Sequence, residues 1–197
     1  MGRYNKINLL NKGEIKMVFI IVIVILVVLG FWVMSTYNSL ITLRERVDNA
    51  KAQIATQIES RWDALKSLIE ATKQYSKHEA EVLESVTEKR ASIGKNSSIS
   101  QMENAEQEFN GVLGRLIAVS ESYPDLKASG VYQSTMASVN KYEDNVRNSR
   151  MIYNDVVTRF NRAIKMFPGS IVAGIFKFVA SDYFEGTETK QDMPSWE

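Results

Sequence analysis

The chain has 197 residues, no cysteine and a net charge of only +1, from 24 Lys and Arg against 23 Asp and Glu. The absence of cysteine excludes disulfides and thiolate metal sites, and the mixed charge gives no basic footprint for nucleic acid, so we expect no nucleic-acid partner. With only three prolines and ten glycines, the composition permits long helices.

The first segment, residues 1–16, is a short basic extension with the sequence MGRYNKINLLNKGEIK. One interpretation is a cytoplasmic flank of the segment that follows. The other is that Met17 is the native start, because Lys12-Gly13-Glu14 can be encoded by a purine tract of the kind that binds bacterial ribosomes. In that case residues 1–16 are not part of the native protein, and the intact mass of the native protein decides between the two.

The stretch Met17–Met34, MVFIIVIVILVVLGFWVM, contains eighteen residues without a charge. An α-helix needs about 20 apolar residues to cross the roughly 30 Å hydrocarbon core of a bilayer, whereas a strand or a signal-peptide core is shorter. Trp32 and Tyr37 lie near its C-terminal end, where amphipathic rings anchor at the headgroups. The sequence therefore predicts a transmembrane helix over residues 17–36, rather than a buried core helix or a cleaved signal.

The side of the membrane on which the rest of the chain lies stays open. Lys and Arg residues close to the ends of a span set its orientation, because the side with more of them stays inside. With Met1 as the start, four basic residues precede the span and Arg44, Arg46 and Lys51 follow it, which favours an inside N-terminus. With Met17 as the start, none precede it, which favours an outside N-terminus and an inside bundle.

Beyond the span, residues 35–93 contain no proline or glycine and carry a single apolar stripe with spacings of three and four. This periodicity predicts one long helix that continues directly from the span and ends at Gly94. The stripe comprises Leu40, Leu43, Val47, Ala50, Ile54, Ile58, Trp62, Leu65 and Ile69, and then thins through Tyr75, Val82 and Val86.

A second helix is predicted to begin at Ser100, where Ser100 and Glu103 fit a capping box. It ends before Tyr123-Pro124, because the residue that precedes a proline is disfavoured in a helix. Its apolar positions again alternate by three and four: Met102, Ala105, Phe109, Val112, Leu116 and Val119.

A third helix is predicted from about Val131 to Phe167, where Pro168-Gly169 ends it. The same alternation marks its apolar face. That face comprises Thr135, Val139, Tyr142, Val146, Ser149, Tyr153, Val156, Phe160, Ala163 and Phe167.

Ser170 then caps a short apolar segment, residues 171–179, which is too short to span a membrane. This segment is either a fourth packed helix or an interfacial piece near the bilayer. We favour packing, because residues after a Pro-Gly break often fold back over the end of a bundle. The polar tail, residues 186–197, is predicted to be flexible.

Three apolar stripes of the same period, joined by short breaks, are typical of an antiparallel helix bundle with coiled-coil-like packing. The predicted class is all-α. An N-terminal transmembrane helix is followed, over residues 37–185, by an antiparallel helix bundle of three long helices and one short one.

Several short motifs are distributed along these elements, and the most specific of them is the run Glu121–Ala128, ESYPDLKA. The others are Tyr37-Asn38-Ser39-Leu40, Arg44, Val47, Ala50, Arg61-Trp62-Asp63, Tyr75, His78-Glu79, Arg90, Glu143, Arg150, Tyr153-Asn154, Phe160-Asn161, Phe167-Pro168-Gly169 and Tyr183-Phe184-Glu185. Together they resemble the pattern of the LemA family over nearly the whole chain from Met17.

This resemblance implies a membrane-anchored helical bundle without an established biochemical activity. The family is usually drawn with a short N-terminus outside and the bundle in the cytoplasm, which agrees with a start at Met17. The chain departs from the family at residues 64–68, which read ALKSL where the family usually has Leu-Ile-Pro-Asn-Leu. The missing proline implies a straighter first helix, and no role can be carried over for the missing asparagine.

The sequence shows no constellation of catalytic or metal-binding residues. His78 is the only histidine, and the residue three positions before it is Tyr75 rather than the glutamate of a Glu-x-x-His pair. No glycine-rich phosphate loop and no nucleophile–base pair can be formed. We therefore expect His78 to be an exposed helix residue, and we expect no metal, no cofactor and no enzymatic activity.

Arg150, Asn154 and Asn161 share one stripe of the third helix and lie beside Tyr153. Either they hydrogen-bond to a facing helix and fix its register, or they form a polar patch for a partner. We favour the first, because buried amides must find partners.

The run Tyr123-Pro124-Asp125 predicts a turn at the end of the bundle, with a docking loop as the alternative. The candidate structural or interaction residues are Tyr37, Asn38, Arg61, Asp63, Tyr123, Pro124, Asp125, Arg150, Tyr153, Asn154, Asn161 and Pro168.

Two hypotheses for function follow. The first is a non-enzymatic, single-pass membrane protein that presents a helical bundle as an interaction or scaffold module, with the lipid bilayer and an unidentified protein as partners. The alternative is an accessory subunit of a membrane transporter or envelope stress system, in which the span makes helix–helix contacts. Gly30 alone forms no small-xxx-small motif in the span, which argues against tight pairing there. Self-association into a homo-oligomer stays open.

Overall fold

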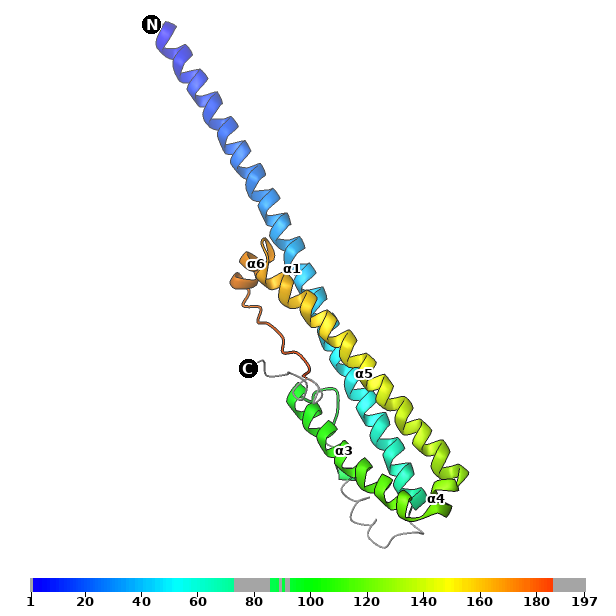
Figure 1. Cartoon of the computed structure of the whole chain (residues 1–197). Helices are drawn as coiled ribbons and strands as arrows, with labels where there is room; N and C mark the ends of the chain where they lie inside the picture. Colours follow the sequence, from blue (N-terminus) through cyan, green and yellow to red (C-terminus); the bar gives the residue numbers. More distant parts are fainter. Residues whose placement is uncertain (1, 73–85, 89, 91–92, 186–197) are drawn as a thin grey trace, which may run out of the picture. The chain divides into compact units, whose positions relative to one another are not determined.

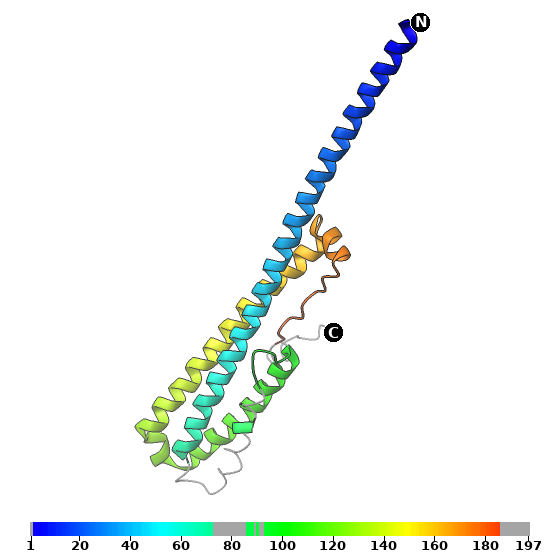
Figure 2. The same cartoon turned by 180° about the vertical axis from the view of Figure 1, so that it is seen from behind.

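The computed structural model describes residues 2–72, 86–88, 90 and 93–185, with side chains described from Glu14 onward. The elements are α1 (Gly2–Thr72), α3 (Ile99–Ser122), α4 (Pro124–Ala128), α5 (Gly130–Lys165) and α6 (Gly169–Ile175), shown in Figures 1 and 2. Over the described residues there is no strand. The prediction of an all-α bundle is confirmed.

The chain divides into two compact units, which are taken separately below. Of the described residues, those in the ranges 2–42 and 162–179 form the first unit, and those in the ranges 43–161 and 180–185 form the second. The predicted first helix was to reach Ile93. The structure describes α1 as far as Thr72, and residues 73–85, which include Tyr75, His78 and Val82, lie outside the described residues.

The apolar stretch of the first unit is helical throughout, and its large side chains are exposed as far as Phe31. From Met17 to Phe31, the large apolar side chains are 47% to 72% exposed. Contact with water is unfavourable for such side chains. By length and composition, α1 is able to cross a membrane, and none of its apolar window is buried.

The core of the first unit lies just after this stretch. Leu40 on α1 and Val172 and Ala173 on α6 are buried together, and they are surrounded by half-buried apolar side chains. These are Val33, Tyr37, Ala163, Ile164 and Phe178. One face of the short C-terminal helix therefore packs on α1, as we favoured from the sequence.

The predicted cap of this short helix is wrong. Ser170 lies inside α6, which begins one residue earlier at Gly169, and Pro168 occupies the N-cap position without a side-chain hydrogen bond. The reason is the close approach of two backbone segments, since a Cβ added to Gly169 would lie 2.1 Å from the carbonyl oxygen of Ala163. Only glycine fits this position, and it allows the chain to reverse immediately after α5.

The second unit is built on the predicted stripe of α1. Every stripe residue from Val47 to Ile69 is buried, while Leu43 is half-buried. In both views α1, α3 and α5 lie side by side within this unit, and α5 runs antiparallel to α1 and α3 (Figures 1 and 2). Trp62 and Phe109 form an edge-to-face pair with ring centroids 5.4 Å apart, which joins α1 to α3 in the core.

The capping box of α3 lies two residues before the predicted one. Ser98 rather than Ser100 is the N-cap: its hydroxyl accepts a hydrogen bond from the Gln101 N–H at 3.2 Å, and its own N–H donates to Gln101 Oε1 at 2.7 Å. Ser98 and Gln101 have the same three-residue spacing as the predicted pair, Ser100 and Glu103. Their capping box satisfies two free N–H groups at the helix start, and the helix is a half-turn longer than predicted.

Two positions of the predicted α5 stripe are wrong. Val157 is buried and Val156 only half-buried, so the buried face is rotated by one residue there. Phe167 is 77% exposed, because α5 ends at Lys165 and Phe167 lies in the turn that follows.

Candidate functional site

Four charged side chains meet in the interior of the second unit, and we call them the charge cluster. Arg61 on α1 places Nη2 3.5 Å from Glu106 Oε1 on α3, while its Nη1 contacts Glu143 Oε2 on α5. Arg150 on α5 places Nη1 2.8 Å from Glu106 Oε2 and Nη2 3.9 Å from Glu143 Oε1. Two positive and two negative charges therefore form a neutral cluster that joins three helices.

The centre of the charge cluster is buried. Arg61 is 1% exposed and Glu106 is 3% exposed, and the Arg61 guanidinium lies 4.0 Å from the centroid of the Phe109 ring. Taking each such ion out of water costs several kcal/mol, which only a well-placed partner offsets. The contacts are formed in one register of the three helices, so the cluster favours that register over its neighbours.

Burial shifts the protonation equilibria of the two central groups. Burial raises the pKa of the Glu106 carboxyl, against the opposing charges of Arg61 and Arg150. It also lowers the pKa of the Arg61 guanidinium, against Glu106 and Glu143. Both shifts mean that the interior disfavours the charged forms, so each ion depends on its partners.

A second polar contact joins α5 to the extended segment Ala180–Glu185, which we call the strap. The Tyr153 hydroxyl donates to the carbonyl oxygen of Asp182 at 2.8 Å. The Asn154 side chain bonds to one strap residue twice: its Nδ2 donates to the Phe184 carbonyl at 3.0 Å, and the Phe184 N–H donates to its Oδ1 at 2.9 Å.

Asn161 forms the same two-point contact with a second strap residue, Ser181. Its Nδ2 donates to the Ser181 carbonyl at 2.9 Å, and the Ser181 N–H donates to its Oδ1 at 2.8 Å. The two asparagines are seven residues apart on α5, and their partners Ser181 and Phe184 are three apart on the strap. Seven helical residues rise about 10.5 Å and three extended residues about 10 Å, so the two repeats match.

This finding corrects the sequence-based expectation for Asn154 and Asn161. We expected bonds to a facing helix, but the partners are backbone groups of the strap, which approaches α5 from 20 to 30 residues further along the chain. An amide suits this role, because it carries both a donor and an acceptor and can replace the neighbouring strand that an extended segment lacks.

Arg150 links the charge cluster to the strap. Its guanidinium pairs with Glu106 and also lies 5.3 Å from the centroid of the Phe184 ring. Phe184 is 3% exposed, and the next residue, Glu185, donates its N–H to Glu103 Oε1 on α3 at 2.7 Å. The strap is therefore held by both α5 and α3.

Asp63 does not join the charge cluster. It is exposed and forms a two-point ion pair with Arg90, in which Arg90 Nη2 lies 3.1 Å from Asp63 Oδ2. It also borders an open hollow of about 460 Å³ that is rich in hydroxyl groups, lined by Ser60, Asp63, Ala64, Ser67, Ser134, Thr135, Ser138 and Tyr142. Neither the ion pair nor the lining of the hollow contains an acidic residue other than Asp63.

The predicted turn at Tyr123-Pro124-Asp125 is the start of the one-turn helix α4. Tyr123 is its N-cap and Pro124 its first residue, a position where the missing N–H of proline is harmless. Asp125 lies in the first turn, where its negative charge interacts favourably with the helix dipole. The next residue, Leu126, is buried. The arrangement is that of a conventional connection.

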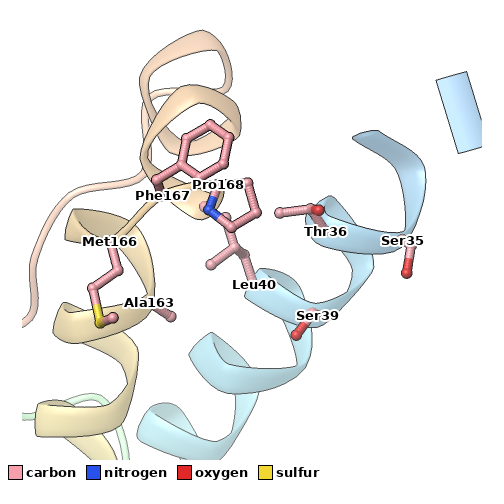
Figure 3. Close-up of a pocket in the computed structure, with 9 residues that line it drawn as sticks. Ser35, Thr36, Ser39, Leu40, Ala163, Met166, Phe167 and Pro168 are labelled. Atoms are coloured by element: carbon pink, nitrogen blue, oxygen red, sulfur yellow. The ribbon is translucent and has the colours of Figure 1, made fainter. Parts of the chain in front are cut away.

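Tyr37, Asn38 and Pro168 belong to the first unit. The Tyr37 ring lies 4.6 Å from that of Phe176 and 5.9 Å from that of Phe178, whereas the Asn38 side chain is exposed. Pro168, which follows a cis peptide bond, helps to line an open hollow of about 370 Å³. Figure 3 shows Ser35, Thr36, Ser39 and Leu40 on one wall of this hollow, with Ala163, Met166, Phe167 and Pro168 on the other.

Comparison with known proteins identifies the family to which this chain belongs. The model of the LemA family matches residues 50–196, about three quarters of the chain. The chain belongs to the LemA family. A protein named LemA from Metamycoplasma hominis is 24% identical to it over 91% of this chain and 83% of its own length.

Two magnetosome proteins are also similar to this LemA family chain. The magnetosome protein MamQ 2 of Paramagnetospirillum magneticum and the magnetosome protein MamQ of Magnetospirillum gryphiswaldense are each 23% identical to it, over 89% of this chain and 74% of theirs. These relatives and the family together indicate a membrane-associated helical protein.

The described part of this LemA family chain contains no group of three or more histidine and carboxylate side chains that could hold a metal ion. His78 lies outside the described residues. In the charge cluster, each carboxylate is already paired with an arginine, which does not suit a cation site.

Sequence reasoning did not single out Glu106, Glu103 or Phe184 as site residues. The sequence did contain a signal for Glu106, because it lies between Ala105 and Phe109 on the buried face of its helix. An unpaired charge there would destabilise the fold, so a partner of opposite charge could have been expected. Phe184 had a weaker signal, its place in the Tyr183-Phe184-Glu185 motif, and Glu103 was expected only in a capping box. The contacts of both residues depend on where the strap lies.

Proposed function

We propose that this LemA family protein is a non-enzymatic, single-pass membrane protein that presents a helical bundle as an interaction or scaffold module. The observation that carries the proposal is α1 itself. One helix contains both an exposed apolar stretch of spanning length and the buried stripe of the bundle, without a break between them. In lipid, the exposed apolar side chains lose their contact with water.

The interior of the bundle supports an interaction role rather than catalysis. The buried arginines and glutamates neutralise one another, and the asparagines are occupied by strap backbone, so these groups serve the fold. The outer surface carries apolar side chains that the bundle does not need. Met151 and Ile152 on α5 are 60% and 53% exposed, side by side in sequence. We propose this pair as part of the partner-binding face.

The orientation that we propose is the one the family resemblance implies, with a short N-terminus outside and the bundle in the cytoplasm. Protease treatment of intact cells and of inverted vesicles tests it. The bundle is cleaved only in inverted vesicles if the proposal holds, and in cells with a permeable outer layer if the orientation is the reverse.

Photo-crosslinking in cells tests the interaction role against an accessory-subunit role. A photo-crosslinking amino acid replaces Ile152 in one variant and Val24 in another, two side chains that are 53% and 55% exposed. A specific adduct from position 152 supports the module, and an adduct with a membrane protein from position 24 supports the alternative. If neither position gives an adduct, both roles are contradicted.

A further inference from the structure

We infer that the segment Met166–Val179, which contains α6, is a second membrane contact that lies in the headgroup region of a phospholipid bilayer. We call it the interfacial segment. The inference rests on the proposed membrane anchor, and it concerns a part of the chain that the anchor does not require.

The interfacial segment has two apolar faces, of which the first unit buries one. Val172 and Ala173 are at most 4% exposed, where they pack on Leu40. Ile171 and Ile175 on the same helix are 49% and 64% exposed. A helix that is apolar on both sides is typical of burial on both sides, and only one side is covered by protein.

The residues that flank α6 extend this exposed apolar surface. Met166 and Phe167 before the helix are 58% and 77% exposed, and Val179 after it is 79% exposed. All of them belong to the first unit, together with the apolar stretch of α1.

The depth of the segment follows from its contacts with α1. A bilayer core of about 30 Å takes up about 20 helical residues, which corresponds to residues 17–36. The interfacial segment packs on Val33, Tyr37 and Leu40, at the C-terminal end of this range. It therefore lies where the hydrocarbon core gives way to headgroups.

Aromatic and basic side chains mark the same level. Tyr37, a residue type that is enriched at the level of the headgroups, packs with Phe176 and Phe178 of the segment. Lys177 and Lys165 are exposed beside it, and cations there are attracted to anionic lipid.

Lys177 also adopts an unusual backbone conformation. Its φ of +56° lies in the left-handed region, where glycine is the common residue after a helix. The turn is closed by the Phe178 N–H, which donates to the Ala173 carbonyl at 2.9 Å. A lysine costs about 1 kcal/mol more than glycine in this conformation. Attraction of the Lys177 cation to lipid headgroups would account for a lysine at this position.

The test measures how deep single labelled positions lie in a bilayer. Because the chain has no cysteine, a single cysteine can carry an environment-sensitive fluorophore without further changes. The labelled variants are Ile175→Cys and Val179→Cys in the interfacial segment, Ile25→Cys in the span, and Ile152→Cys on α5 as the matched exposed control. The full chain is reconstituted in phosphatidylcholine vesicles with and without phosphatidylglycerol.

Three quenchers then report the surroundings of each dye: lipid with a spin label near the headgroup, lipid with a spin label deep in the acyl chain, and aqueous iodide. We expect headgroup-labelled lipid to quench positions 175 and 179, with blue-shifted emission, while iodide quenches position 152 alone. Quenching of position 25 by lipid labelled deep in the acyl chain verifies the anchor independently.

Two results overturn the inference. If position 25 is quenched by lipid but positions 175 and 179 respond to iodide like position 152, or to none of the quenchers, the anchor stands and the interfacial contact is wrong. If position 25 itself is quenched only by iodide, the proposed function fails first, and the inference fails with it. Helical circular dichroism spectra that match the parent chain establish that each variant is folded.

Discussion

The Asn161 side chain pairs with a single residue, Ser181, through two hydrogen bonds of 2.9 and 2.8 Å. Asn154 forms the same two-point pair with Phe184, and both asparagines lie on α5. Because no strand of the described residues pairs with the strap, these side chains satisfy its backbone groups and hold it on the bundle.

Replacing Asn161 by Ala is expected to release the strap at Ser181. Two hydrogen bonds are lost and a half-buried N–H and C=O are left without partners, so the free energy of unfolding falls by roughly 1 to 3 kcal/mol. Hydrogen exchange of the Ser181 amide measures the local effect. Asn148→Ala, at an exposed position on the same helix, is the matched control and should leave both quantities unchanged.

Equal protection of the Ser181 amide in the Asn161→Ala variant and the parent chain would contradict this role of Asn161. Unchanged stability together with a lost crosslinked partner would instead show that the asparagine face binds a partner.

Arg61→Gln is expected to destabilise the bundle strongly. The substitution leaves Glu106 buried with Arg150 as its only remaining cation in the charge cluster, and breaking a buried pair costs about 3 to 5 kcal/mol. Thermal and denaturant unfolding of the full chain in detergent measures the change. Arg46→Gln, on an exposed face of the same helix, should change stability by less than about 0.5 kcal/mol. Similar values for the two variants would show that the charge cluster is not structurally important.

The sequence was sufficient for the parts of the fold that depend on local periodicity. From Val47 to Ile69 every residue predicted on the stripe of α1 is buried, because apolar side chains on one helix face must be buried against something. The buried face is wider than the predicted stripe, since it also includes Ala55, Arg61, Ala64 and Leu68. At α3 we predicted Ser100 as the N-cap, whereas Ser98 is the N-cap, because the hydrogen bonds of the capping box are formed by Ser98 and Gln101.

The candidate site was much less predictable, because it depends on contacts between distant parts of the chain. Arg61 and Glu143 are 82 residues apart in sequence, and no periodicity connects them. The strap carries no regular pattern, so its course along α5 could not be read from residues 180–185. The asparagines were noticed as polar residues beside an apolar stripe, but their partners were not.

Tyr153 is expected to make stability sensitive to alkaline pH. Burial, followed by the charges of Asp182 and Asp48, raises the pKa of its hydroxyl to about 12, whereas a tyrosine in an unfolded chain titrates near 10. Between these values the unfolded chain loses the proton first. Stability due to this group is therefore complete below pH about 10 and is lost as the pH rises to about 12, by roughly 2 to 3 kcal/mol.

The Tyr153→Phe variant isolates this contribution, because it lacks the titrating hydroxyl. Its free energy of unfolding should be lower than that of the parent at pH 8, where the hydrogen bond to Asp182 is missing, and should fall less between pH 10 and 12. Parallel pH profiles for the two chains would exclude Tyr153 as the source of the alkaline loss.

Gly169→Ala is expected to disturb the start of α6. The added Cβ would lie 2.1 Å from the Ala163 carbonyl oxygen, a backbone atom that cannot rotate away, so α6 must shift or unfold. We expect faster hydrogen exchange at α6 amides and a lower melting temperature. The control is Gly114→Ala in α3, where an added Cβ meets no atom of another described element within 4 Å and alanine should stabilise the helix by about 1 kcal/mol. A stabilising effect at both positions would contradict the tight approach at Gly169.

The membrane anchor is tested most directly by alkaline carbonate extraction of membranes from cells that express the full chain. We predict that the protein stays in the pellet, floats with lipid on a density gradient and is released only by detergent, because the apolar stretch of α1 is buried in hydrocarbon. Recovery of the protein in the carbonate supernatant, dissolved without detergent, would contradict the account.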